Sequence, residues 1–70
     1  MRGTIERVIE AKGLGFIQGE DGQDYVFRRS ALDPAEPFDQ LLRGAAVTFD
    51  TVHEPTGLRA EAIRIVKSGA

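Results

Sequence analysis

Short runs of alternating apolar and polar residues divide this chain into strand-length segments. Successive side chains of a β-strand point to opposite faces, so alternation of this kind predicts strands that are buried on one face. Gly, Pro and Asp interrupt the runs about every eight to twelve residues, a spacing typical of an all-β barrel or sandwich. Strands are predicted over residues 4–9, 14–18, 25–28, 46–52 and 59–66.

The segments between these strands are rich in residues that favour turns. Gly and Asp tolerate a positive φ, and Pro presets the backbone for a turn. We expect turns at 11–13, 19–23 and 54–57, a short helical turn at 30–33, a loop with two prolines at 33–37, and a further turn at 38–42.

Alternation also assigns the strand residues to faces. The first strand is an exception, because strict alternation from Ile5 would bury Arg7, which has no obvious partner. A bulge near Arg7 would leave that side chain outside and place Val8 or Ile9 inside. Closing the sheet into a barrel would remove the exposed edges of a flat sheet. The residues predicted to point inward are Ile17, Tyr25, Phe27, Val47, Phe49, Ile63 and Ile65, and those predicted to point outward are Leu14, Phe16, Val26 and Arg28.

Length and composition exclude several classes of protein. We expect the 70 residues, 1–70, to form one small domain. There is no Cys, so neither a disulfide nor a thiolate metal site can form, which fits a reducing cytosol. No apolar run is long enough to cross a membrane, and residues 1–5 lack the apolar region of a secretory signal. We therefore expect a soluble, cytoplasmic protein that has no membrane partner.

The charge balance argues against strong, non-specific binding to phosphate. The formal net charge is −2 and the sequence pI is about 5.2. Such binding is favoured by a basic protein. Any surface for nucleic acid must therefore be a local basic patch on an acidic body, and we expect binding through it to be weak or selective.

Arrangements of residues that would support catalysis or metal binding are not found. His53 is the only His, and it has neither a Cys nor a second His for a metal site. No nucleophile–base pair is visible. The acidic residues Glu20, Asp21 and Asp24 lack the ligand spacing of a calcium loop and indicate a solvated turn. We predict a protein that is not an enzyme and has no cofactor or metal.

The most informative segment is Lys12-Gly13-Leu14-Gly15-Phe16-Ile17. Glycines alternate with Leu14 and Phe16, and residues without a side chain leave room around their neighbours. A flat apolar platform beside Lys12 suits stacked bases with a phosphate nearby. In the alternative interpretation, this is a tight hairpin in which the glycines serve geometry and Leu14 is incidental. Spacing alone does not separate the two.

Several segments together resemble the bacterial cold-shock domain from residue 3 to about residue 66. Residues 12–17 are similar to the first ribonucleoprotein motif of that family, with Leu14 where an aromatic residue is usual, and residues 26–29 stand at the second motif. The resemblance implies a five-stranded antiparallel OB-fold barrel whose second and third strands present stacking side chains to single-stranded DNA or RNA. The other matching segments are Gly3-Thr4-Ile5, Asp24 with Ser30-Ala31-Leu32, and Gly44 with Val47-Thr48-Phe49.

The chain departs from the family at several positions. The resemblance implies stacking by Phe16 and Phe38, which stand at matching aromatic positions. Each stack is worth about 1–3 kcal/mol, so missing aromatics weaken binding unless something replaces them. Glu61 stands where the family tends to have a small residue and Ile9 where it tends to have a polar one, and either can indicate a local change in register. The family usually has Trp at Arg7, Phe at Val26, His at Arg28, Phe at Arg29 and Lys at Glu6.

Arginine can replace part of the missing stacking, because a guanidinium plane stacks on a base and pairs with phosphate. We therefore expect arginine-based binding that is sensitive to salt. In the alternative interpretation, Arg28 and Arg29 are a solvated surface pair balanced by Glu6, Glu10 or Asp24. Their position beside Phe16 favours the binding interpretation. The predicted interface contains Arg7, Lys12, Leu14, Phe16, Val26, Arg28, Arg29, Phe38 and Arg59.

These features predict a single cold-shock-like domain that binds single-stranded RNA or DNA with low sequence specificity, as a monomer or weak dimer. Binding would be passive and would shift hairpins towards the open form by mass action. The resemblance implies an RNA chaperone or a regulator of transcription or translation. The alternative is a cold-shock fold with reduced nucleic-acid binding that acts as a protein–protein interaction module. Salt separates them, because only phosphate binding weakens steeply as salt rises.

Overall fold

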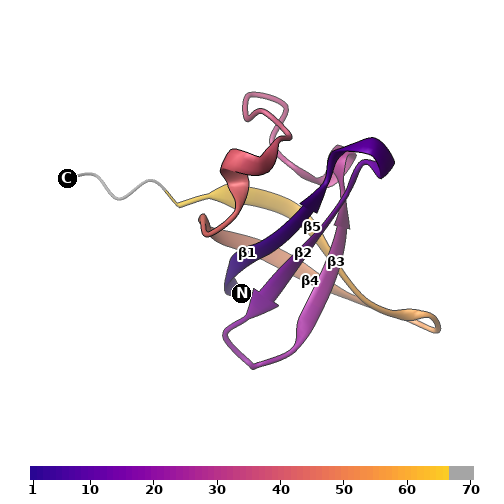
Figure 1. Ribbon diagram of the computed structural model, residues 1–70. Helices are drawn as coiled ribbons and strands as arrows, with labels where there is room; N and C mark the ends of the chain where they lie inside the picture. Colours follow the sequence, from indigo (N-terminus) through magenta and orange to yellow (C-terminus); the bar gives the residue numbers. More distant parts are fainter. Residues whose placement is uncertain (67–70) are drawn as a thin grey trace.

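Five strands in the described part of the chain, residues 1–66, close into a β-barrel in the computed structural model (Figure 1). Around the barrel they follow the order β1-β2-β3-β5-β4, and β4 pairs again with β1. Neighbouring strands are antiparallel except β3 and β5, which meet in a short parallel contact. The predicted all-β barrel is confirmed. The strands are β1 (Arg2–Ile9), β2 (Leu14–Gly19), β3 (Asp24–Arg28), β4 (Ala46–Glu54) and β5 (Gly57–Ile65).

Short 3₁₀ segments connect some of these strands, each where the sequence predicts a turn. The segment before β4 is tied to the barrel, because Gln40 Nε2 donates a hydrogen bond to the Val8 carbonyl at 2.7 Å. Within residues 1–66, no helix has the length and apolar character needed to cross a membrane. The segments are η1 (Glu10–Lys12), η2 (Arg29–Ala31) and η3 (Gln40–Leu42).

Two strands begin two residues earlier than the sequence predicts, because a partner strand continues the ladder, and β3 begins one residue earlier, at Asp24. β1 begins at Arg2, which pairs with Thr48 of β4. β5 begins at Gly57, which pairs with Glu54 across the predicted turn. Alternation cannot locate such ends, since they depend on the neighbouring strand rather than on local sequence.

One apolar core fills the barrel. Strand residues predicted to point inward are buried, with the exception of Ile65, which is half-buried because it ends β5 and packs against the core from its margin. Leu32 and Leu42 also join the core, although neither belongs to a strand whose alternation would assign it a face. The buried apolar residues are Ile5, Val8, Ile17, Tyr25, Phe27, Leu32, Leu42, Val47, Phe49, Ala60 and Ile63.

A bulge in β1 turns Arg7 away from the core. The register between β1 and β2 shifts between Ile5 and Arg7. Ile5 and Val8 are therefore both buried, while Arg7 is exposed and Ile9 is half-buried. This confirms the predicted bulge.

A second irregularity bends β5. The register between β4 and β5 shifts between Thr48 and Asp50, and Ala62 has a φ of 50°. As a result, Ala60 and Ile63 both face the core, although they are three residues apart. The local change in register that the unusual residue at 61 indicated is therefore present.

Candidate nucleic-acid interface

The outward residues of neighbouring strands form a continuous row across the barrel. Arg7 of β1 lies opposite Phe16 of β2, and Phe16 lies opposite Val26 of β3. Val26 in turn lies opposite Arg59 of β5. Directly opposed residues share a face, with Cβ atoms about 5 Å apart. Four strands therefore contribute to one surface, although the residues are distant in sequence.

A groove of about 330 Å³, here called the central groove, is hollowed into this surface. Leu14, Phe16, Val26 and Leu58 give it an apolar centre, and all four are half-buried rather than exposed. The apolar side chains suit a flat, uncharged ring, and the polar side chains suit groups at the edge of such a ring. Its polar and charged lining consists of Asp24, Arg28, Glu54, Thr56 and Arg59.

Phe16 also borders a second hollow of about 380 Å³, here called the Arg7 hollow. Glu6, Arg7 and Asp24 complete its lining. The structure thus places Phe16 between two depressions, with an aliphatic residue on one side and a guanidinium on the other.

The glycines of residues 12–17 serve the fold rather than the outer face. Gly15 is buried, and a Cβ on it would overlap the ring of Phe27, which occupies that space inside the barrel. Gly13 has a φ of 64° and ends η1 in a left-handed conformation that favours glycine. The expectation that these glycines make room on the platform is therefore wrong. Leu14 and Phe16 nevertheless point outward, as predicted.

One end of the face is basic. Its cations, all exposed, are Lys12, Arg28 and Arg29. The backbone N–H of Arg29 donates a hydrogen bond to the Gly13 carbonyl at 2.8 Å, and this bond holds η2 against the β2–β3 hairpin. Among residues 1–66, none of these three cations forms an ion pair. The interpretation in which nearby carboxylates balance Arg28 and Arg29 therefore receives no support from the structure.

The opposite end of the face is acidic. Glu6 and Asp24 lie together in the Arg7 hollow. Partial loss of hydration raises the pKa of Glu6, and the neighbouring Asp24 carboxylate raises it further. Two carboxylates this close repel each other and any phosphate placed beside them. A bound polyanion therefore meets more favourable charge at the Lys12 end than in the Arg7 hollow, where Arg7 faces two carboxylates.

Phe38 lies apart from the central groove. It is half-buried and packs edge-on against Phe27, with ring centroids 6.1 Å apart and planes at 80°. It borders a hollow formed by residues 29–30 and 32–38, here called the Phe38 hollow, which shares no residue with the central groove. The consecutive residues Arg28 and Arg29 border one hollow each, so the two lie along one path on the surface.

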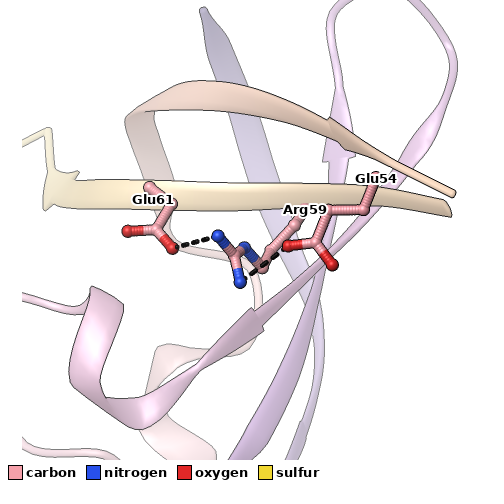
Figure 2. A network of polar contacts seen from close by, with 3 residues as sticks. All are labelled: Glu54, Arg59 and Glu61. Carbon is pink, nitrogen blue, oxygen red and sulfur yellow. Dashed lines mark ion pairs between the residues drawn. The ribbon is translucent and has the colours of Figure 1, made fainter. Parts of the chain in front are cut away.

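Arg59 lies on the face as predicted, but its charge is already compensated. Its Nη1 lies 2.7 Å from Oε1 of Glu54, and its Nη2 lies 2.9 Å from Oε1 of Glu61 (Figure 2). Two carboxylates and one guanidinium give the trio a formal charge of 1 − 2 = −1. The sequence contains part of this signal, because residues 59 and 61 are two apart in a strand and share a face. The contribution of Glu54 depends on the hairpin and has no local signal.

Comparison with known proteins places these features in a family context. The model of the 'cold-shock' DNA-binding domain matches residues 1–66. A cold shock-like protein of Aquifex aeolicus is 37% identical over 65 residues, which cover 93% of each chain. The major cold shock protein CspA of Pseudomonas aeruginosa is 37% identical over 65 residues, covering 91% of each chain. The cold shock-like protein CspA of Stigmatella aurantiaca is 33% identical over 64 residues, covering 91% of this chain and 94% of its own.

Proposed function

Because this chain belongs to the cold-shock domain family, we propose that it binds single-stranded RNA or DNA on the outer face of β1, β2 and β3. The observation that carries the proposal is the row of Arg7, Phe16 and Val26 on three neighbouring strands. An accessible ring between two hollows offers a stacking surface to an unpaired base. Paired bases within a duplex are already stacked and do not fit this role.

Phe16 is the principal stacking residue in this proposal, and Leu14 and Val26 extend its apolar surface. Lys12 and Arg28 bind phosphate at the basic end. They are exposed and unpaired within residues 1–66, so a phosphate displaces no protein partner.

Arg7 and Arg29 extend binding beyond the central groove. Arg7 lies beside Phe16 in the Arg7 hollow, where its guanidinium stacks on a second base. Arg29 leads into the Phe38 hollow, where Phe38 supplies a second aromatic ring. A strand that crosses all three hollows passes from one stacking position to the next without requiring base-specific contacts.

The resulting action is passive. A protein that binds the unpaired strand and not the duplex shifts the equilibrium towards the open strand by mass action, without a chemical step. This action supports a role as an RNA chaperone or as a regulator of transcription or translation. It is proposed for a single domain that binds and does not catalyse.

The test is a fluorescence titration with labelled oligothymidine and oligouridine at two salt concentrations. Replacing Phe16→Ala should weaken binding by about 1–3 kcal/mol through the lost stack. Gln18→Ala is the matched control, because Gln18 is exposed on the same strand but lines neither the central groove nor the Arg7 hollow. Three or four phosphate contacts should give a log–log salt slope of about −2 to −3. A folded protein that binds neither oligomer at low salt would contradict the proposal.

A second candidate function is a protein–protein interaction module. The observation in its favour is that Glu6, Asp24 and Glu54 line the two hollows around Phe16, where they repel phosphate. An apolar centre with a charged margin is also typical of protein-binding hot spots. Binding of a protein through Phe16 should persist at high salt, whereas binding of a single strand should not.

A further inference from the structure

Glu54 occupies a distinctive place at the margin of the central groove. It ends β4, pairs with Gly57 across the hairpin and lines the groove. Only its Oε1 is joined to Arg59, and in Figure 2 the second carboxylate oxygen points away from the guanidinium. The side chain is 35% exposed, so a ligand in the groove can reach it.

We propose that Glu54 makes the central groove selective for guanine, with its carboxylate bound to the Watson–Crick edge of a base that rests on Phe16 and Val26. This inference depends on the proposed binding of single strands and adds a preferred base to it. The groove volume of about 330 Å³ lies at the small end of the range for ligand pockets, which suits one base rather than a longer segment.

The choice of guanine follows from donors and acceptors. An ionised carboxylate only accepts hydrogen bonds, and it does so through both oxygens. Guanine presents two neighbouring donors, N1–H and the N2 amino group. Uracil and thymine present one N–H between two carbonyl oxygens, which the carboxylate repels. Adenine and cytosine present an amino group beside an unprotonated ring nitrogen, which it also repels. Guanine alone offers the carboxylate two donors side by side.

Arg59 acts as a positioning residue for Glu54. Its guanidinium is held between two carboxylates, with its Nη atoms 2.7 and 2.9 Å from their oxygens. It therefore fixes the orientation of the Glu54 carboxylate beside the groove. Oε1 retains acceptor capacity beyond its contact with Arg59, because a carboxylate oxygen accepts more than one hydrogen bond. Since Arg59 lies opposite Val26, the carboxylate lies beside the platform rather than distant from it.

Glu61 supplies an internal control. It binds the same guanidinium and carries the same charge as Glu54, but it does not line the groove. The variants Glu54→Gln and Glu61→Gln thus make the same change in net charge, while only the first alters the groove.

The experiment measures affinity for short uridine or thymidine oligomers, whichever binds more tightly, in which one central base is replaced by guanine, hypoxanthine, adenine or cytosine. We expect the guanine oligomer to bind at least about fivefold more tightly than the unmodified oligomer, as for one bidentate base contact. Hypoxanthine lacks the N2 amino group, so its advantage should fall to less than about twofold. Glu54→Gln should abolish the guanine preference, and Glu61→Gln should retain it. Thermal melting establishes that both variants fold.

The outcomes separate this inference from the proposed function. Absence of binding to every oligomer would overturn both. Binding without a guanine preference, or a preference that survives in Glu54→Gln, would overturn the inference and leave single-strand binding intact. Equal loss of preference in both variants would also overturn it, because charge rather than the carboxylate in the groove would then be responsible. The hypoxanthine comparison in the unaltered protein tests the two-donor contact even if Glu54→Gln fails to fold.

Discussion

Arg28 and Arg59 border the same groove but present opposite environments to a ligand. Arg28 is exposed and has no ion-pair partner in the described residues, whereas Arg59 is flanked by Glu54 and Glu61. A phosphate can bind Arg28 without meeting a protein carboxylate, but at Arg59 it must approach two carboxylates that already pair with the guanidinium. The difference shows that the number of arginines on a face overstates its positive potential when some of them are already paired.

The largest effect on binding is expected at the basic end. In the double variant Arg28→Gln/Arg29→Gln, two phosphate contacts are lost, so the log–log salt slope should flatten by about 1.4. Titrations across a salt series measure this slope. The melting temperature should stay nearly unchanged, because both side chains are exposed and make no ion pair within residues 1–66. An unaltered slope would show that these arginines do not contact phosphate.

Arg59→Gln makes the same kind of substitution at the paired arginine, and we expect it to change stability rather than the salt dependence of binding. The salt slope should remain as in the unaltered protein, because the paired guanidinium contacts no phosphate. Stability should fall by about 0–1 kcal/mol for each lost pair, the range for exposed ion pairs, and chemical denaturation measures it. If Arg59→Gln flattened the slope as much as a change at Arg28, Arg59 would contact a phosphate despite its two carboxylate partners.

The smallest effect concerns the acidic end of the face. Because partial dehydration and Asp24 raise the pKa of Glu6, this carboxyl is neutralised at a higher pH than an ordinary Glu. Binding of a single strand should therefore tighten as the pH falls from neutral towards the raised pKa of Glu6, since repulsion of phosphate decreases. Glu6→Gln should bind more tightly at neutral pH and lose part of this dependence. A variant with the same pH dependence as the unaltered protein would assign it to other groups.

The same shift has a defined sign for folding. A raised pKa in the folded state means that the contribution of Glu6 to stability is fully present below its unfolded pKa of about 4.3. It is lost as the pH rises through the raised folded value. Glu6→Gln should therefore be slightly more stable than the unaltered protein at neutral pH, which urea denaturation at two pH values measures.

Much of the fold follows from local sequence because alternation is a local property. The inward positions of β2 and β3 and the bulge at Arg7 are predicted from period-two patterning and from the difficulty of burying an unpaired charge. Leu32 and Leu42 are missed, since they lie in or beside 3₁₀ segments where that period does not apply. Ala60 is missed because the irregularity at Ala62 changes which residues of β5 face inward.

The candidate site is less predictable, because its parts meet only through pairing of distant strands. Phe16 and Arg28 can be placed on one face from the sequence, and the structure brings them to one groove. The ion pair between Arg59 and Glu54 requires the hairpin, and the separation of Phe38 from Phe16 requires the position of the loop after η2. The role of Gly15 is decided by a ring on the neighbouring strand, which the pattern of residues 12–17 does not reveal.

Phe27 links the central groove to the Phe38 hollow, although the two share no lining residue. Its ring fills the space that a side chain at Gly15 would take and meets Phe38 edge-on, and Phe27 is among the residues that line the central groove. The ring itself is fully buried, so it supports the groove from inside the barrel. The same buried residue therefore belongs to the core and to the support of the binding face. We expect a substitution that moves this ring to alter both the backbone beneath the central groove and the support of Phe38.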